Sequence, residues 1–129
     1  MTELKNYKMF IGGEWLDSDT DKTFETLNPE NNKPWARVPE ASASDVDKAV
    51  KAAHNAFEGE WSKLLPRDRA KFLRAIGNKL RENAELLGKI ETIDTGKLFR
   101  ETNKQAIYIA EYYDYYAGLA DKVEGTVLP

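Results

Sequence analysis

Residues 91–101 read ETIDTGKLFRE, and within them Asp94 and Lys97 have types and a spacing that could do chemistry. Asp-Thr-Gly carries the catalytic carboxylate of aspartic proteases, which need two carboxylates sharing one proton. Those carboxylates lie on loops after strands, whereas Asp94 follows about ten residues with helical periodicity. Gly-Lys ends a phosphate-binding P-loop, but Lys97 is followed by Leu98 and no glycine lies five residues before Gly96. The protease interpretation is therefore disfavoured, and the P-loop is excluded.

The third interpretation is a helix that ends here, with Gly96 as its left-handed cap and Lys97 as a cation that suits the helix dipole. It leaves Asp94 unexplained. A carboxylate in the last turn faces the negative end of the dipole, which costs a few tenths of a kcal/mol up to about 1 kcal/mol. We therefore expect a positive charge beside Asp94, supplied by Lys97, Arg100 or a bound metal cation. The residues alone favour the side chains.

The elements that must position this helix end begin with strands. Residues 1–41 have the pattern of a small antiparallel β meander, with KMFIGGEWL (8–16) broken by a glycine pair and TFETLNP (23–29) ended by Asn-Pro. PWARVPE (34–40) is predicted to be a short edge strand, because proline cannot donate to a ladder.

From residue 42 the apolar period becomes helical. Ser42 or Ser44 can cap the first helix, with Asp45 or Asp47 completing a capping box. The predicted helices cover about 42–58, 65–82, 83–96 and 100–123. The fold class is therefore α+β. Residues 1–41 form the strand segment and residues 42–129 the helical segment of one incomplete domain.

The last helix carries five of the six tyrosines. Tyr108 and Tyr112 could line a ligand channel, but aromatic stripes at helical spacing are usually core, so burial is the expectation. This helix is apolar on more than one face, and four helices with one meander offer few layers to cover it. The chain therefore has the pattern of part of a larger protein, or of an obligate oligomer.

Composition narrows the classes of function. The net charge of −3, without a basic run, argues against nucleic-acid binding. No apolar stretch is long enough to span a bilayer and the first residues lack the pattern of a secretory signal, so a cytoplasmic location is expected. Cysteine is absent, which excludes thiolate metal sites and a cysteine nucleophile within these residues.

Six stretches, in their order and spacing, resemble a known family. They are FIGGEW, FETLNPENN, VPEASASDVDKAVKAAHNAF, RDRAKFLRAIGNKL, ENAELLGKIETIDTGK and YYAGLADKVEG. Together they resemble the N-terminal portion of the NAD(P)-dependent aldehyde dehydrogenase superfamily over residues 7–129, nearest to its betaine-aldehyde and broad-specificity branches.

The resemblance implies the fold of that superfamily and its chemistry. A cysteine thiolate attacks the aldehyde, a backbone N–H and an Asn amide stabilise the oxyanion, hydride passes to NAD or NADP, and a Glu activates the water that releases the acid. The resemblance places all these groups, and the main nucleotide-binding segment, beyond Pro129. We therefore expect an N-terminal segment that is inactive by itself.

The resemblance also implies site residues and partners. A monovalent cation, K⁺ or Na⁺, would be held by the Asp94 carboxylate and by the backbone carbonyls of Thr26 and Leu27, with a further ligand from outside the chain. Tyr108 and Tyr112 become candidates for the substrate tunnel. The implied partners are a small-molecule aldehyde, further copies in a dimer or tetramer, or the C-terminal part of the enzyme. The alternative is a non-enzymatic oligomerisation or partner-binding helical module, with the tyrosine helix as its interface.

Overall fold

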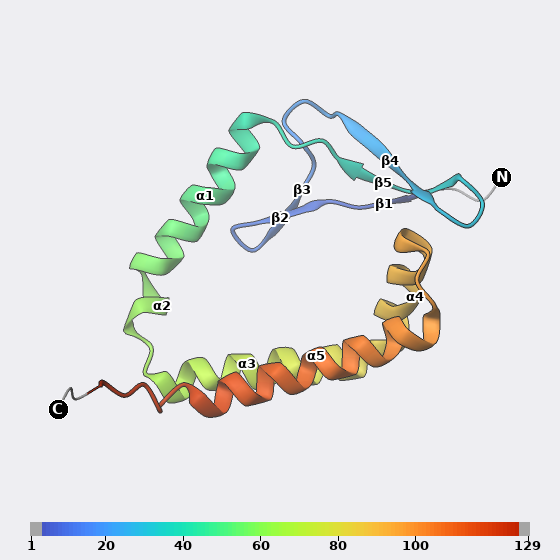
Figure 1. Cartoon of the computed structure of the whole chain (residues 1–129). Helices are drawn as coiled ribbons and strands as arrows, with labels where there is room; N and C mark the ends of the chain where they lie inside the picture. The colour runs from blue at the N-terminus through green and yellow to red at the C-terminus, as the bar shows by residue number, and fades with distance from the viewer. Residues whose placement is uncertain (1–3, 127–129) are drawn as a thin grey trace. The chain divides into compact units, whose positions relative to one another are not determined.

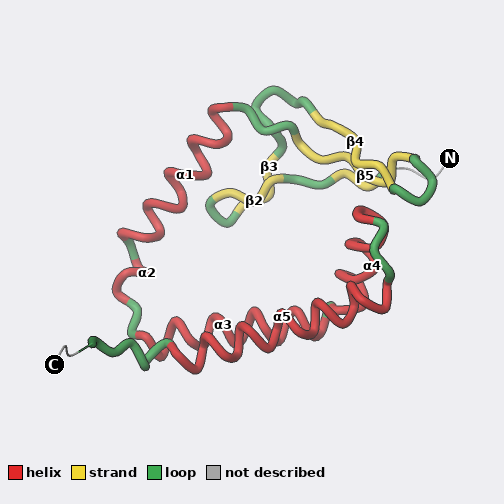
Figure 2. Tube along the Cα trace, in the orientation of Figure 1, coloured by secondary structure: helices red, strands yellow, loops and turns green. Residues whose placement is uncertain are grey.

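A computed structural model describes residues 4–126, which form short strands followed by helices (Figure 1). The strands are β1 (Lys5–Asn6), β2 (Met9–Ile11), β3 (Glu14–Leu16), β4 (Thr23–Asn28) and β5 (Lys33–Pro39). The helices are α1 (Ala43–Glu58), α2 (Glu60–Lys63), α3 (Pro66–Glu82), α4 (Ala84–Thr95) and α5 (Phe99–Leu119). Figure 2 shows the change from strand to helix after β5. The expected α+β class is confirmed, with the short α2 added between two predicted helices.

The described residues form two compact units. One holds residues 4–63 together with 93–96, and the other holds residues 64–92 and 97–126. The division expected at residues 41 and 42 separates strands from helices, whereas compactness groups α1 and α2 with the strands. As a domain division it stays a prediction.

β5 is the centre of the three-stranded sheet, so its prediction as an edge strand is wrong. The strand order is β1-β5-β4, with β1 parallel and β4 antiparallel to β5. β1 contributes only two residues, which pair with Ala36 and Arg37. Pro34 and Pro39 lie outside that paired stretch, so neither proline has to donate to β1. β2 and β3 form a separate antiparallel hairpin.

The capping box predicted at the start of α1 is confirmed, with Ser42 and Asp45 as its members. The Ser42 N–H donates to Asp45 Oδ2 at 2.9 Å, and the Asp45 N–H donates back to Ser42 Oγ at 3.1 Å. The Asp45 carboxylate also accepts from Ser18 Oγ at 2.8 Å and from the Asp19 N–H at 3.3 Å. It is only 2% exposed. One carboxylate therefore ties the loop after β3 to the first turn of α1.

In the second unit α3 packs along α5, and α4 meets α5 at a point of close backbone approach. A Cβ built on Gly88 of α4 would lie 2.8 Å from Asn103 N on α5, so only glycine fits there. The buried Thr102 forms hydrogen bonds where the two helices come close. Its Oγ1 donates to the Gly88 carbonyl at 2.9 Å and pairs with Thr92 Oγ1 at 3.0 Å.

The buried apolar side chains of the described residues are small. All of them are alanines: Ala36, Ala70, Ala84, Ala106, Ala110 and Ala117. Large apolar side chains stay exposed, among them Trp15 (66%) and Phe57 (67%). The expectation that the tyrosines of α5 are core is wrong for this chain, since Tyr108 is 55% and Tyr112 47% exposed. The physical reason is the one anticipated: these helices alone provide no layer to cover that face.

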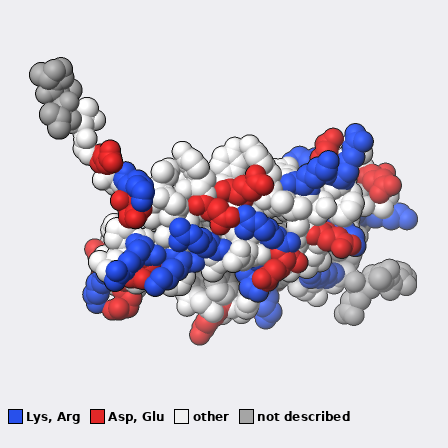
Figure 3. Space-filling view, turned by 90° about the horizontal axis from the view of Figure 1, so that it is seen from below, with Lys and Arg blue, Asp and Glu red and all other residues white. Residues whose placement is uncertain are grey.

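Acidic and basic side chains intermingle on the face drawn in Figure 3. This agrees with the small net charge of −3. Among residues 4–126, no helix combines the length and the apolar character that crossing a bilayer requires.

Candidate functional site

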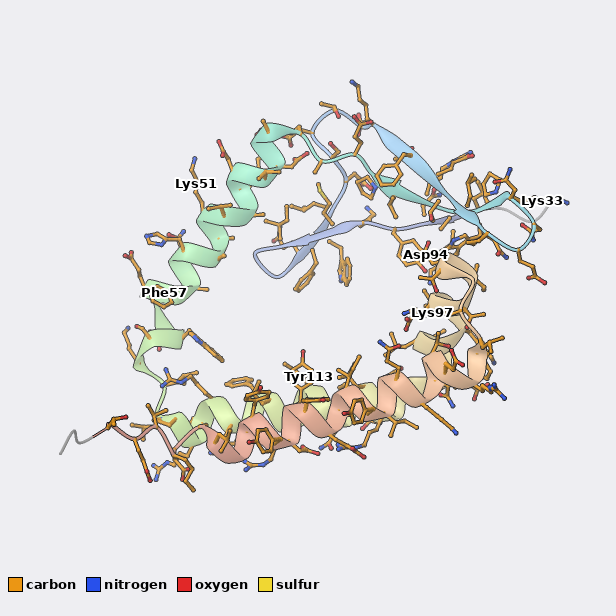
Figure 4. The ribbon with its side chains drawn as sticks, in the orientation of Figure 1. Lys33, Lys51, Phe57, Asp94, Lys97 and Tyr113 are labelled. Atoms are coloured by element: carbon orange, nitrogen blue, oxygen red, sulfur yellow. The ribbon has the colours of Figure 1, made fainter. Side chains whose placement is uncertain are left out.

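The candidate site begins at the C-terminal end of α4, where Asp94 lies in the last turn (Figure 4). The chain leaves the helix through Gly96, which has φ +75°, so the predicted left-handed cap is confirmed. A Cβ on Gly96 would meet Pro29 Cβ at 3.4 Å, which places this helix end directly against the residue that follows β4. The helix therefore stops against the sheet, with its last carboxylate beside β4.

Within residues 4–126, two uncharged donors reach the Asp94 carboxylate, and both bind the same oxygen. Thr26 Oγ1 of β4 donates to Asp94 Oδ1 at 2.7 Å, and Trp35 Nε1 of β5 donates to Oδ1 at 3.3 Å. Lys97, one of the two side chains expected to offset the charge, donates to Glu91 Oε1 at 2.7 Å. Neither of these donors carries a positive charge, and the cation expected beside Asp94 stays a prediction.

A β-bulge brings the β4 backbone to the same place. The register between β4 and β5 shifts between Thr26, opposite Ala36, and Leu27, opposite Pro34, so Trp35 is the extra residue on β5. Pro34 has no N–H, so it cannot donate to Leu27, the β4 residue opposite it. The regular ladder is thus interrupted at Thr26 and Leu27, the two residues whose carbonyls were expected to bind a cation.

These groups fit a hard monovalent cation. Carboxylate and carbonyl oxygens are the ligands that such ions prefer, and the hydrogen bonds that reach Asp94 in the described residues leave Oδ2 for a metal. Within residues 4–126 no group of three or more His, Cys, Asp or Glu side chains could hold a metal ion, so a cation here would depend on one carboxylate and on backbone carbonyls. Beside Trp35, the buried Tyr7 hydroxyl has no hydrogen-bond partner among the described residues, a pattern typical of a position next to water or an ion.

The two expected tyrosines lie together on α5. Tyr108 and Tyr112 share a hydrogen bond of 2.8 Å between their hydroxyls, and their rings meet edge to face at 4.9 Å. With Glu111 and Tyr115 they line an open groove of about 290 Å³. The hydrogen bond from Tyr108 raises the pKa of Tyr112 above its ordinary value, because it stabilises the protonated hydroxyl.

Sequence reasoning found the residues around Asp94 only in part. It named the Thr26 backbone but not the Thr26 hydroxyl, which is the shorter contact to the carboxylate. It missed Trp35, for which the sequence offered one signal: a tryptophan placed directly after a proline in a predicted strand. Asp94 with Thr26 and Leu27 belongs to one compact unit, and Tyr108 with Tyr112 belongs to the other.

Comparison with known proteins decides the family. Residues 15–129 match the sequence model of the aldehyde dehydrogenase family. The chain belongs to that family. It is 41% identical over 127 residues to (Z)-2-((N-methylformamido)methylene)-5-hydroxybutyrolactone dehydrogenase of Acinetobacter baylyi, covering 98% of this chain and 26% of that protein. An aldehyde dehydrogenase of Aspergillus niger is 40% identical, covering 93% of this chain and 24% of that protein.

Solved structures agree with this assignment. An aldehyde dehydrogenase from Bacillus cereus superposes with a TM-score of 0.90 at 38% identity, over 97% of this chain and 26% of that one. Betaine aldehyde dehydrogenase from Staphylococcus aureus, solved with NAD⁺, gives a TM-score of 0.87 at 38% identity, over 95% and 25%. The aldehyde dehydrogenase fold expected from the resemblance is confirmed, and the chain spans about a quarter of the length of these relatives.

Proposed function

We propose that the native protein containing this chain oxidises an aldehyde to a carboxylic acid, with NAD⁺ or NADP⁺ as hydride acceptor. The observation that carries the proposal is the match of nearly the whole chain to aldehyde dehydrogenases at about 40% identity. The betaine aldehyde dehydrogenase solved with NAD⁺ favours that cofactor over NADP⁺. The chain has no cysteine, so in this proposal the nucleophilic thiolate comes from sequence outside these 129 residues.

The residues of this chain have supporting roles in the proposal. Asp94, with the backbone carbonyls of Thr26 and Leu27, holds K⁺ or Na⁺ and so fixes the end of α4 to the bulge in the sheet. Tyr108 and Tyr112 line the path of the aldehyde. One hydroxyl of that pair donates to the other at 2.8 Å, which leaves the second hydrogen to donate to a polar substrate atom.

The enzyme proposal is tested on the native protein expressed from its complete gene. We expect it to reduce NAD⁺ in the presence of an aldehyde and to release the corresponding acid, detected by absorbance and by chromatography. We expect the 129-residue chain, purified alone, to give no more than a heat-treated control. Absence of aldehyde-dependent reduction of both NAD⁺ and NADP⁺ by the native protein would refute the proposal.

The cation is tested through thermal stability. We expect the melting temperature of the native protein to rise with KCl or NaCl at ionic strength held constant with choline chloride, because a ligand that binds only the folded state stabilises it. Asp94→Asn should abolish this rise. Glu85→Gln, in the first turn of the same helix and paired with Lys89, should preserve it. An Asp94→Asn variant with the full response would eliminate the site.

A non-enzymatic interaction module remains the second candidate, favoured by the exposed tyrosines of α5. Tyr115 is 62% and Tyr116 58% exposed, a surface typical of a protein interface. Within the enzyme proposal the same surface is covered by the rest of the protein or by further copies in a cytoplasmic dimer or tetramer. An inactive native protein that self-associates, and dissociates on Tyr116→Glu, would favour the module.

A further inference from the structure

We propose that Trp35 is the positioning residue of the cation site: its indole N–H fixes the Asp94 carboxylate so that Oδ2 faces the ion, and its fluorescence reports cation binding. This inference rests on the cation site proposed above. It assigns to Trp35 a role in affinity that neither the sequence pattern nor the family match assigns.

The indole of Trp35 is placed by a bulge and by a neighbouring aromatic ring. Trp35 is the additional residue of the β5 bulge, and a bulge redirects the side chain that it carries. The half-buried ring is held on one side by Tyr7, edge to face at 6.1 Å and 77°. Lys5 Nζ lies 4.6 Å from the centre of the Tyr7 ring and completes the stack. The indole is therefore a fixed donor. It is held by the Tyr7 ring, which Lys5 of β1 contacts in turn.

The Asp94 carboxylate is oriented by hydrogen bonds from two strands. Trp35 Nε1 and Thr26 Oγ1 both donate to Oδ1, from β5 and β4 respectively. Two donors from different strands fix both the rotation and the tilt of the carboxylate, which one donor cannot do. The Asp94 side chain is exposed, so without them it would sample several rotamers. A preformed ligand binds its ion more tightly because less entropy is lost on binding.

A competing effect has the opposite sign. A hydrogen bond withdraws electron density from the carboxylate and so weakens its attraction for a cation. The Trp35 bond is 3.3 Å long, just beyond the 2.7–3.2 Å typical of N–H···O bonds, so this withdrawal is small, and the bond orients the carboxylate only together with the shorter Thr26 bond of 2.7 Å. Immobilising one side chain is worth about 0.5–1.5 kcal/mol, or about a two- to twelvefold change in affinity. We therefore expect orientation to dominate and Trp35 to tighten cation binding.

The test replaces Trp35 by phenylalanine, which keeps a smaller aromatic ring against Tyr7 and removes the donor. We expect Trp35→Phe to raise the KCl concentration at half-maximal thermal stabilisation about two- to tenfold, at constant ionic strength. The tryptophan emission change on adding KCl, present in the unaltered protein, should disappear. Trp15→Phe is the matched control: that indole is 66% exposed and stacks on Phe10, so both responses should persist.

The outcomes separate this inference from the cation site itself. If KCl changes neither stability nor emission in the unaltered protein, the site fails and the inference with it. If Asp94→Asn removes the KCl response while Trp35→Phe leaves its midpoint unchanged, the site stands and the role of Trp35 is refuted. The unaltered protein labelled with 5-fluorotryptophan gives a further measurement, independent of whether a variant folds. One ¹⁹F resonance, that of Trp35, should move with KCl, and a spectrum that does not move while stability rises would also refute the inference.

Discussion

Replacing Gly88 by alanine tests how much the close approach of α4 and α5 contributes to the free energy of unfolding. The new Cβ would lie 2.8 Å from Asn103 N and 2.9 Å from Asn103 Cα, where contacts of 3.4–4 Å are ordinary. The helices would have to separate by about 0.6 Å, because backbone atoms cannot rotate away as a side chain can. That movement would also lengthen the 2.9 Å bond from Thr102 Oγ1 to the Gly88 carbonyl.

Three contributions set the expected change in the free energy of unfolding. Overpacking costs about 1–3 kcal/mol, and weakening a buried hydrogen bond costs about 0.5–1.5 kcal/mol. Alanine is better than glycine in a helix by about 0.8–1.0 kcal/mol, which opposes them. We expect Gly88→Ala to lower the free energy of unfolding by about 1–3 kcal/mol, a five- to 150-fold change in the unfolding equilibrium, measured by urea denaturation followed by circular dichroism.

Two further glycines serve as references for the effect of Gly88→Ala on stability. A Cβ on Gly118 of α5 meets nothing within 4 Å, so Gly118→Ala should be neutral or stabilising by up to about 1 kcal/mol. A Cβ on Gly77 of α3 lies 3.1 Å from the Ala110 carbonyl oxygen, so Gly77→Ala should fall between the two. A Gly88→Ala variant as stable as Gly118→Ala would refute the reasoning, since helix propensity alone would then account for both.

Three other predictions concern single polar contacts. Thr102→Val, which keeps the shape and removes the buried hydroxyl, should cost about 1–2 kcal/mol in urea denaturation. Backbone and hydroxyl donors, led by the Ser42 N–H, lower the pKa of Asp45 from 3.8 to about 2. Its contribution to stability should therefore be complete above about pH 4 and be lost as the pH falls towards 2, a step that unfolding curves should no longer show in Asp45→Asn. Tyr108→Phe should lower the raised pKa of Tyr112, followed by ultraviolet titration of tyrosinate.

Each of these changes has a control of the same chemistry. Asp47→Asn, on the exposed side of α1, should leave the acid step in place. Tyr115→Phe, in the same groove, should leave the titration of Tyr112 unchanged, because the hydroxyl that binds Tyr112 belongs to Tyr108. An unchanged Tyr112 titration in Tyr108→Phe would show that the hydroxyl pair does not form in solution. A Thr102→Val variant of full stability would show that its hydroxyl is not needed at the Gly88 carbonyl.

What the sequence predicted well was encoded locally. The Ser42-x-x-Asp45 spacing specifies a capping box because donor and acceptor lie three residues apart on one turn. Gly96 specifies the end of α4 because few other residues adopt its positive φ. The misplaced charge of Asp94 was also visible locally, since only the direction of the helix dipole is needed to notice it.

What the sequence did not predict depends on distant partners. The central position of β5 follows from pairing with two residues near the N-terminus, which no pattern within β5 reveals. Trp35 meets Asp94 across 59 positions, and the bulge that makes Trp35 the extra residue of β5 depends on the register with β4. The exposure of Tyr108 could not be read from periodicity, because a stripe of aromatic residues looks the same whether this chain or another surface covers it.

The segment 93–96 completes a compact unit whose other members, the strands and the first two helices, all precede residue 64. The chain between them, residues 64–92, must be synthesised first, which takes about 1.5 to 6 seconds at about 5–20 residues per second. Thr26 and Trp35 then find Asp94 by closing loops of 68 and 59 residues. We therefore expect the Asp94 hydrogen bonds to form late in folding, with φ-values near zero, while the capping box of α1 forms early. During synthesis, the contacts between the sheet and Asp94 would therefore form only after the last turn of α4 has left the ribosome.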